Sequence, residues 1–231
     1  MAMKIRLLSI IALLLGTATQ LFAHDFEAAN SDGVTIYYNI TDAVKKTVCV
    51  TYKGNDKYSA AYIAASINVP SSVEYEGQTY SVTAIGDFAF YGCFLSSESE
   101  VSLPSTIEAI NLKAFSTCWS LKSISFTGTA LKTIGNYAFS ECYMASITIP
   151  NSVNEIGEYA FKNCNALTDV TLPSALKDIS PYAFLECTCL ENVVIQGNVE
   201  TIGKNAFEDC KNLKTKIKDL ERDNIILLER K

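Results

Sequence analysis

Cysteine is the residue type whose number and spacing in this sequence most readily suggest chemistry. The chain has eight cysteines, and six of them each follow an Ala-Phe pair by three positions: Cys93, Cys118, Cys142, Cys164, Cys187 and Cys210. If successive units stack like parallel strands, about 4.8 Å apart, these side chains form a column that points one way. A disulfide needs facing β-carbons and zinc needs convergent ligands, which a column does not provide. We therefore expect a buried ladder of free thiols and no metal site.

Residues that could support catalysis are sparse elsewhere. His24 is the only histidine, and we place it at the mature N-terminus or just inside a flexible end, whereas Ser-His-Asp and Cys-His catalysis need an ordered imidazole. The sequence contains neither a phosphate-binding Gly-rich loop with Lys-Ser/Thr nor a His-Glu-x-x-His helix. Acidic residues are interpreted as a solvated surface, although a pair of carboxylates could still meet in space: Glu155, Glu158, Asp169 and Glu191. We predict no catalytic residue, no cofactor and no enzyme.

The elements that position the cysteines are repeated units. The Ala-Phe pair occurs six times at nearly equal intervals, and a period between about 20 and 50 residues is typical of a solenoid whose units bury their apolar sides against each other. Stretches such as Ile147-Thr148-Ile149 recur at a constant interval, so length changes fall between strand and Phe. A parallel sheet imposes this regularity. Between strand and Phe, we expect Gly86, Gly135, Gly157 and Gly203 to supply a positive φ at a corner, before one short outer helical turn.

The two ends of the chain differ from the repeats. Residues 1–23 have basic residues, an apolar run and small residues, as in a secretory signal peptide cleaved after Ala18 or Ala23. Residues 24–80 alternate like half-buried strands, and we predict a β-rich N-terminal cap. The repeats occupy residues 81–215. Residues 216–231 form a C-terminal cap or tail, and the sequence leaves open whether Cys49 is free or paired with Cys189.

The charge and hydropathy of the sequence argue against some classes of binding partner. The net charge of the full sequence is −6, and signal cleavage would remove Lys4 and Arg6 but no acidic residue. An acidic chain argues against nucleic acid or an anionic membrane as partner. After residues 1–23 the sequence has no second apolar stretch of spanning length, so we expect no membrane insertion after cleavage. The expected location is secreted or cell surface, with the periplasm possible.

The repeat resembles the leucine-rich repeat of the BspA type. The resemblance rests on Leu167 to Pro173, which reads Leu-x-x-Val-x-Leu-Pro, and on the following Ile179, Ala183-Phe184 and Cys187. It covers roughly residues 81–215. The resemblance implies a β-dominated α/β-type solenoid, namely a right-handed leucine-rich-repeat coil with a parallel sheet on its concave side. The usual role in that family of secreted and surface proteins, common in anaerobic bacteria of gut and mouth, is adhesion to host proteins or other cells.

The central residue of each strand should face outward from the sheet. This predicts a candidate ligand-binding column, with flanking residues that widen the same patch: Ser102, Ser125, Thr148, Thr171 and Val194, flanked by Ser123, Ser146, Asp169 and Asn192. Hydroxyl and β-branched residues also simply suit an exposed strand, so the pattern has a structural explanation as well. We expect a non-enzymatic binding or adhesion module for a protein or glycan on host or neighbouring cells. The alternative is a structural or periplasmic spacer without a dedicated ligand.

Overall fold

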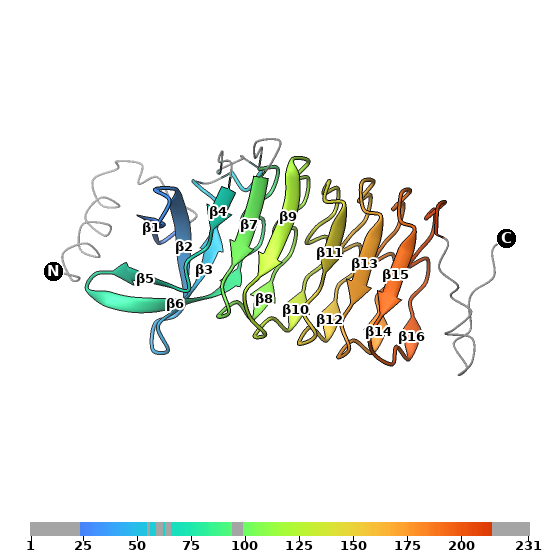
Figure 1. Ribbon diagram of the computed structural model, residues 1–231. Helices are drawn as coiled ribbons and strands as arrows, with labels where there is room; N and C mark the ends of the chain where they lie inside the picture. Colours follow the sequence, from blue (N-terminus) through green and yellow to red (C-terminus); the bar gives the residue numbers. More distant parts are fainter. Residues whose placement is uncertain (1–23, 55, 59–61, 63–65, 94–98, 214–231) are drawn as a thin grey trace, which may run out of the picture.

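Each repeat folds into one coil that contributes a longer and a shorter strand. The computed structural model describes residues 24–54, 56–58, 62, 66–93 and 99–213. Figure 1 shows the coils stacked side by side along one axis, with the N-terminal strands at one end. Apolar residues that bracket a polar one form the longer strand, and the Ile that precedes the corner ends the shorter one. The repetitive sequence thus produces a β-solenoid.

The longer strands lie on one side of the coil. They are β4 (Ser66–Asn68), β7 (Ser99–Leu103), β9 (Leu121–Phe126), β11 (Ser146–Thr148), β13 (Asp169–Leu172) and β15 (Asn192–Ile195). Pairing is parallel, with Ser102 opposite Ser125 and Thr171 opposite Val194. The predicted parallel sheet is therefore present, but as two three-stranded sheets, β4-β7-β9 and β11-β13-β15. Figure 1 shows β9 and β11 further apart than their neighbours.

The shorter strands form a second side. They are β8 (Ala109–Ile110), β10 (Thr133–Ile134), β12 (Glu155–Ile156), β14 (Asp178–Ile179) and β16 (Thr201–Ile202). The ladder runs without interruption from β8 through β10 to β12, and β14 pairs separately with β16. We call the place where β9 and β11 are not paired the opening. There the two coils are still joined on the second side, through the pairing of β10 with β12.

The segment before the repeats is rich in strands. It contains β1 (Phe26–Ala29), β2 (Thr35–Asp42), β3 (Thr47–Thr51), β5 (Ser72–Tyr75) and β6 (Gln78–Ile85). Glu76 and Gly77 connect β5 to β6 with φ of 50° and 70°, as a two-residue hairpin turn requires. β6 pairs with β3 on one edge and with β8 on the other. One strand thus links this segment to the coil.

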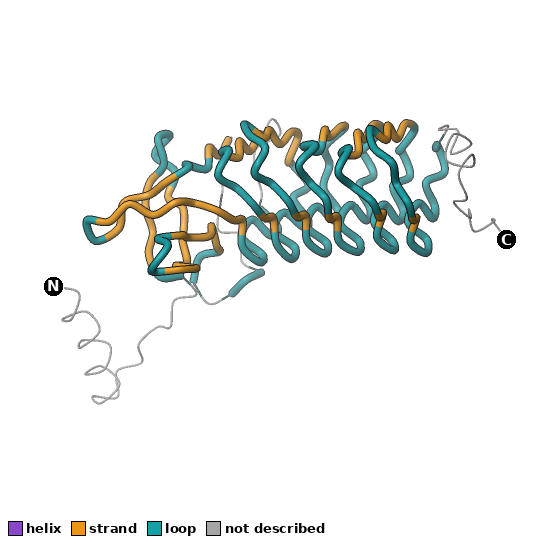
Figure 2. The backbone as a smooth tube through the Cα atoms, turned by 90° about the horizontal axis from the view of Figure 1, so that it is seen from below, coloured by secondary structure: helices purple, strands orange, loops and turns teal. Residues whose placement is uncertain are grey.

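The third side of the coil consists of turns, and the predicted outer helical turns are not found: the described residues contain no helix (Figure 2). Ala138 N–H donates to Gly135 O and Cys142 N–H donates to Phe139 O, which closes two tight turns. Between them, Phe139 N–H donates to Ala160 O of the next coil at 2.8 Å. A helix would direct its N–H groups back along its own chain. Here hydrogen bonding between coils replaces helical bonding.

The expected role of the corner glycines is also wrong. The glycines with positive φ are Gly33, Gly54, Gly77 and Gly92, and none of the four corner glycines is among them. A β-carbon on Gly157 would lie 2.6 Å from the backbone nitrogen of Asn136, and one on Gly203 would lie 2.4 Å from that of Pro181. Glycine is needed there because adjacent coils approach closely. The left-handed conformation falls instead on residues such as Tyr137 and Glu141, with φ of 58° and 61°.

The core is a column of stacked phenylalanine rings beside the column of thiols. Phe115, Phe139 and Phe161 are fully buried, and their ring centroids are 5.3 Å apart from one to the next. Tyr62 extends the column at its N-terminal end, with its ring 4.6 Å from that of Phe90. The predicted placement of Phe in the interior is confirmed. It is the hydrophobic core that these stacked coils share.

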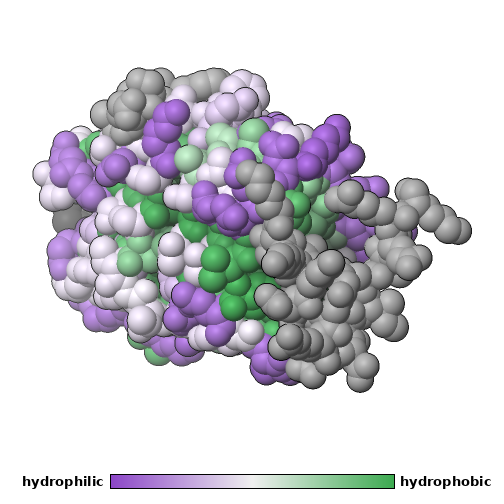
Figure 3. Space-filling view, turned by 45° about the vertical axis from the view of Figure 1, so that its right-hand side comes forward, coloured by the Kyte–Doolittle hydropathy of each residue, from purple (hydrophilic) through white to green (hydrophobic). Residues whose placement is uncertain are grey.

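The C-terminal end of the coil leaves apolar surface partly exposed (Figure 3). Ile195, Ile202 and Phe207 are half-buried, whereas their equivalents one coil earlier are buried. The predicted signal peptide and the predicted C-terminal cap or tail lie outside the described residues.

Candidate functional site

The outward residues of the longer strands form what we call the sheet face. The nine predicted residues form a central row and a flanking row, and the opening between β9 and β11 divides both rows into two parts. On the C-terminal side, Thr148, Thr171 and Val194 lie opposite one another in register. On the N-terminal side, Ser102 lies opposite Ser125, and Ser123 lies opposite Glu100. The sheet face is thus continuous within each sheet, and no strand pairing among the described residues joins the two.

The flanking row on the C-terminal side is a hydrogen-bonded group. Ser146 lies opposite Asp169, which lies opposite Asn192. Asn192 Nδ2 donates to Asp169 Oδ1 at 2.8 Å, and Thr168 Oγ1 donates to Asp169 Oδ2 at 2.6 Å. The bond from Thr168, followed by that from Asn192, lowers the pKa of Asp169 below its usual value. This half of the sheet face therefore carries a fixed negative charge.

A hollow of about 450 Å³ lies on the sheet face at the opening between the two sheets. Its lining combines apolar side chains with hydroxyl groups: Ser123, Ile124, Ser125, Phe126, Gly128, Ser146, Ile147, Thr148 and Pro150. Four of the nine predicted residues line it. None of the lining residues is charged. The hollow can therefore take an uncharged group that is partly apolar.

Several residues of this face were not predicted from the sequence. Asn68 extends the column, because it pairs with Ser102 across β4 and β7. Its surrounding Ile67-Asn68-Val69-Pro70 has the same pattern as Ile147-Thr148-Ile149-Pro150, which was the available signal. Two exposed aromatic residues outside the longer strands, Trp119 and Tyr143, were also not predicted.

Trp119 and Tyr143 each follow a column cysteine, just before β9 and β11. Their exposed fractions are 55% and 48%. Exposed aromatic side chains are the type that most often anchors a protein interface.

The column thiols are donors in the contact between coils. Cys142 Sγ donates to Phe115 O at 3.0 Å, and Cys164 Sγ donates to Phe139 O at 3.1 Å. Burial, with the neighbouring thiol of Cys118, raises the pKa of Cys142 well above its ordinary value. A thiol held in its protonated form is a poor nucleophile and a poor metal ligand. These cysteines support the fold.

All eight cysteines lie in the described part of the chain, and all are free, including Cys49 and Cys189. The expected ladder of unbridged thiols is confirmed. Within the described residues, no group of three or more His, Cys, Asp or Glu side chains is placed to hold a metal ion.

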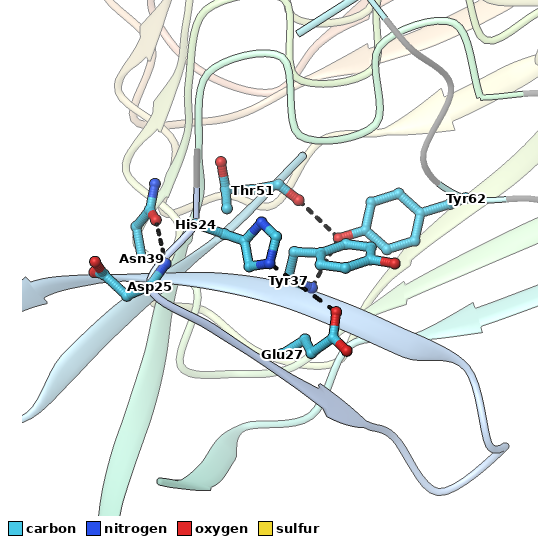
Figure 4. Close-up of polar contacts among 7 residues, drawn as sticks. All are labelled: His24, Asp25, Glu27, Tyr37, Asn39, Thr51 and Tyr62. Atoms are coloured by element: carbon cyan, nitrogen blue, oxygen red, sulfur yellow. Dashed lines mark hydrogen bonds and ion pairs between the residues drawn. The ribbon is translucent and has the colours of Figure 1, made fainter. Parts of the chain in front are cut away.

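His24 precedes β1, and its ring packs against Tyr37 of β2 (Figure 4). Its ring lies 4.8 Å from that of Tyr37, and Nε2 is 4.0 Å from Glu27 Oε2. The next residue is fixed as well, because Asp25 N–H donates to Asn39 Oδ1 at 3.1 Å. Burial is the main cause of a lowered His24 pKa, so the neutral imidazole is favoured.

The repeats identify the family. Residues 83–214 match six copies of the BspA type leucine-rich repeat region. The chain belongs to the BspA-type leucine-rich repeat family. The match spans more than half of the sequence and includes every strand from β7 to β16. The resemblance noted from Leu167 to Cys187 is thereby confirmed.

Solved structures of leucine-rich repeat proteins resemble this fold. A leucine-rich repeat protein of T. pallidum is 24% identical with a TM-score of 0.53, over 89% of this chain and 94% of that one. A leucine-rich cell surface protein of Faecalibacterium prausnitzii A2-165 is 26% identical with a TM-score of 0.60, over 82% of this chain and 54% of that one. This chain thus spans about half of the second protein. No match was found among curated proteins.

The described residues include no helix long and apolar enough to cross a membrane.

Proposed function

We propose that this BspA-type chain is an exported, non-enzymatic module that binds a protein or glycan on host or neighbouring cells through its sheet face. The observation that carries the proposal is the alignment of small polar side chains along the longer strands. Thr148 and Thr171 stand in register on one sheet, with the exposed Val194 as the next member of the row, while the apolar residues on either side of Thr148 and Thr171 point into the core. Repeat proteins use such extended surfaces for binding.

The chemistry of the sheet face supports recognition over catalysis. Its described side chains offer hydroxyl, amide and carboxylate groups, and the carboxyl of Asp169 is committed to two hydrogen bonds. A catalytic carboxylate would instead need a partner acid with a pKa moved in the opposite direction. One of the similar solved structures is a leucine-rich cell surface protein, which supports a location outside the cell.

Two lysines placed on the sheet face should weaken binding. The Thr148→Lys/Thr171→Lys variant adds bulk and positive charge where the ligand would lie, so we expect an affinity loss of about tenfold or more. The measurement is binding of the labelled protein to a panel of extracellular-matrix proteins and glycans.

The matched control adds the same two charges elsewhere. Asn154→Lys/Asn212→Lys changes two exposed asparagines outside the longer strands and should bind like the wild type. Unfolding midpoints of both variants show that the fold is kept. If wild type and the sheet-face variant bind the panel equally, the proposal is wrong. A panel that stays blank for every protein would favour a structural spacer.

A further inference from the structure

The opening between β9 and β11 originates in two compensating changes of length. In each repeat a buried aliphatic residue follows the last inward residue of the longer strand. Leu176 follows Leu172 by four positions, whereas Leu131 follows Phe126 by five. The following repeat is one residue short, because Met144 follows its column cysteine by two positions, whereas Leu167 follows by three. The constant interval between strands is kept, but both connections to this strand pair are altered.

Backbone hydrogen bonds that join other coils are missing here. Between β11 and β13, Thr168 N–H donates to Ala145 O at 2.8 Å and Ile149 N–H donates to Thr171 O at 3.2 Å. The equivalent bonds one coil earlier would run from Ala145 N–H to Lys122 O and from Phe126 N–H to Thr148 O. Neither forms among these described residues. Two parallel strand edges therefore face the opening with free backbone groups.

The interior is also accessible at this place. Ile124 and Phe126 occupy inward positions of β9 and are only half-buried, whereas Val170 and Leu172 at the same positions of β13 are 1% and 0% exposed. In this respect β9 resembles β15, the final strand, whose inward Val193 and Ile195 are half-buried as well. The middle of the coil thus contains a strand edge of the kind normally found at an end.

We propose that the opening between β9 and β11 binds an extended, uncharged peptide segment of a partner protein. The proposal rests on the binding function proposed above and names its site and ligand class. The peptide backbone bonds to the free edge of β9, as in strand addition to an exposed sheet edge. An apolar side chain of the peptide enters the hollow lined by Ile124, Phe126 and Ile147.

The lining selects this ligand class. Ser123, Ser125, Ser146 and Thr148 supply hydroxyl groups that suit peptide N–H and C=O groups, and no lining residue carries a charge that would pair with an ionic ligand. A glycan does not present donors and acceptors at the regular spacing of a strand edge. It also has no apolar side chain to contact Ile124, Phe126 and Ile147.

The test uses a variant in which the repeat lengths are restored. Thr129 is deleted, and a serine is inserted between Tyr143 and Met144, as Ser120 stands before Leu121. Hydrogen exchange of the full chain should show that the amides of Phe126 and Ala145 exchange faster than those of Ile149 and Thr168 in the wild type. In the restored variant the amides of Phe126 and Ala145 should become protected, which shows that the sheet has closed.

The probe is a phage-displayed library of random peptides, panned on the full chain. Peptides enriched on wild type are synthesised and their affinities measured by fluorescence anisotropy. We expect binding at least about tenfold weaker to the restored variant and to Ser125→Lys, and unchanged binding to Asn154→Lys/Asn212→Lys, whose two positions lie outside the longer strands and outside the hollow.

The outcomes separate this proposal from the previous one. Equal affinity for the wild type and the restored variant, or no enrichment on the wild type, overturns the peptide site. A neutral glycan that binds the wild type but not the restored variant, without peptide enrichment, overturns the ligand class. If the panel ligand is lost from Thr148→Lys/Thr171→Lys but kept by the restored variant, the sheet face binds and the opening does not.

Discussion

Replacing Phe161 by alanine should lower the free energy of unfolding by about 3–5 kcal/mol. Phe161 is fully buried, and its ring stacks on Phe139 at 5.3 Å and on Phe184 at 5.0 Å. The change leaves a cavity and removes two aromatic contacts at once. Because each coil contacts only its neighbours, the cavity should also weaken the coupling between the two halves of the solenoid. Denaturant unfolding followed by circular dichroism should show both the loss and a broader transition.

Phe207 provides the matched control. It occupies the same repeat position in the last coil, is half-buried, and stacks on Phe184 at 5.2 Å. Phe207→Ala should therefore cost less, about 1–2 kcal/mol, and should leave the transition sharp. Equal losses for the two variants would contradict a core that is shared along the whole coil.

Replacing Gly157 by alanine should destabilise the protein by about 1–3 kcal/mol or more. The added β-carbon would lie 2.4 Å from Asn136 Oδ1, 2.6 Å from Asn136 N and 2.7 Å from the carbonyl carbon of Gly135. Two of these atoms are backbone, so adjacent coils must separate. That separation would also stretch the 2.7 Å bond from Gly157 N–H to Ile134 O. The same unfolding measurement gives the loss.

Ser180 is the appropriate comparison, because it stands at the equivalent corner and already carries a β-carbon. Ser180→Ala should change the free energy of unfolding by no more than about 0.5 kcal/mol. The ladder of shorter strands is interrupted between β12 and β14, next to this residue, which is consistent with a wider spacing there. If Gly157→Ala is as stable as Ser180→Ala, close approach of the coils does not explain the corner glycines.

The columns of the core could be predicted because they depend only on spacing. Phe161 and Cys164 recur with a nearly constant period, and a constant period in a stacked coil places equivalent side chains above one another. Their burial and the free state of the thiols follow from that. The hydrogen bond from Cys164 Sγ to Phe139 O could not be derived, because it depends on the conformation of the turn between them.

The helical form predicted for the outer turns is not found in the described residues, and their local sequence permits two conformations. Glu158-Tyr159-Ala160-Phe161 is compatible with a short helical turn when taken alone. In the coil, Tyr159 adopts a φ of 58°, and the N–H of Phe161 bonds to Ala183 of the next coil. A hydrogen bond between units decides the conformation, and it is visible only once the units are stacked.

The sequence shows a change of repeat length near the opening, but this change alone does not predict that the sheet is interrupted. The interval from Phe139 to Phe161 is shorter than that from Phe115 to Phe139, while the strands keep a constant interval. That offset shows where lengths change, but side-chain period alone predicts an uninterrupted sheet. Similarly, the predicted cap of residues 24–80 contains β4, which pairs with β7 of the coil although a longer stretch of chain separates Ile67 from Val101 than separates later equivalent strands. The longer connection obscured the equivalence of β4, although its sequence Ile67-Asn68-Val69-Pro70 has the repeat pattern.

Thiol counting with Ellman's reagent tests the central claim most directly, namely that the coils share one interior lined by columns of Phe and Cys. The six column cysteines are buried, whereas Cys49 and Cys189 are half-buried. In native protein we expect rapid reaction at Cys49 and Cys189 at most, because buried protonated thiols react slowly. In denaturant all eight should react. Column thiols that react at once in the native protein, or that stay unreactive after unfolding without reductant because they are bridged, would contradict this claim.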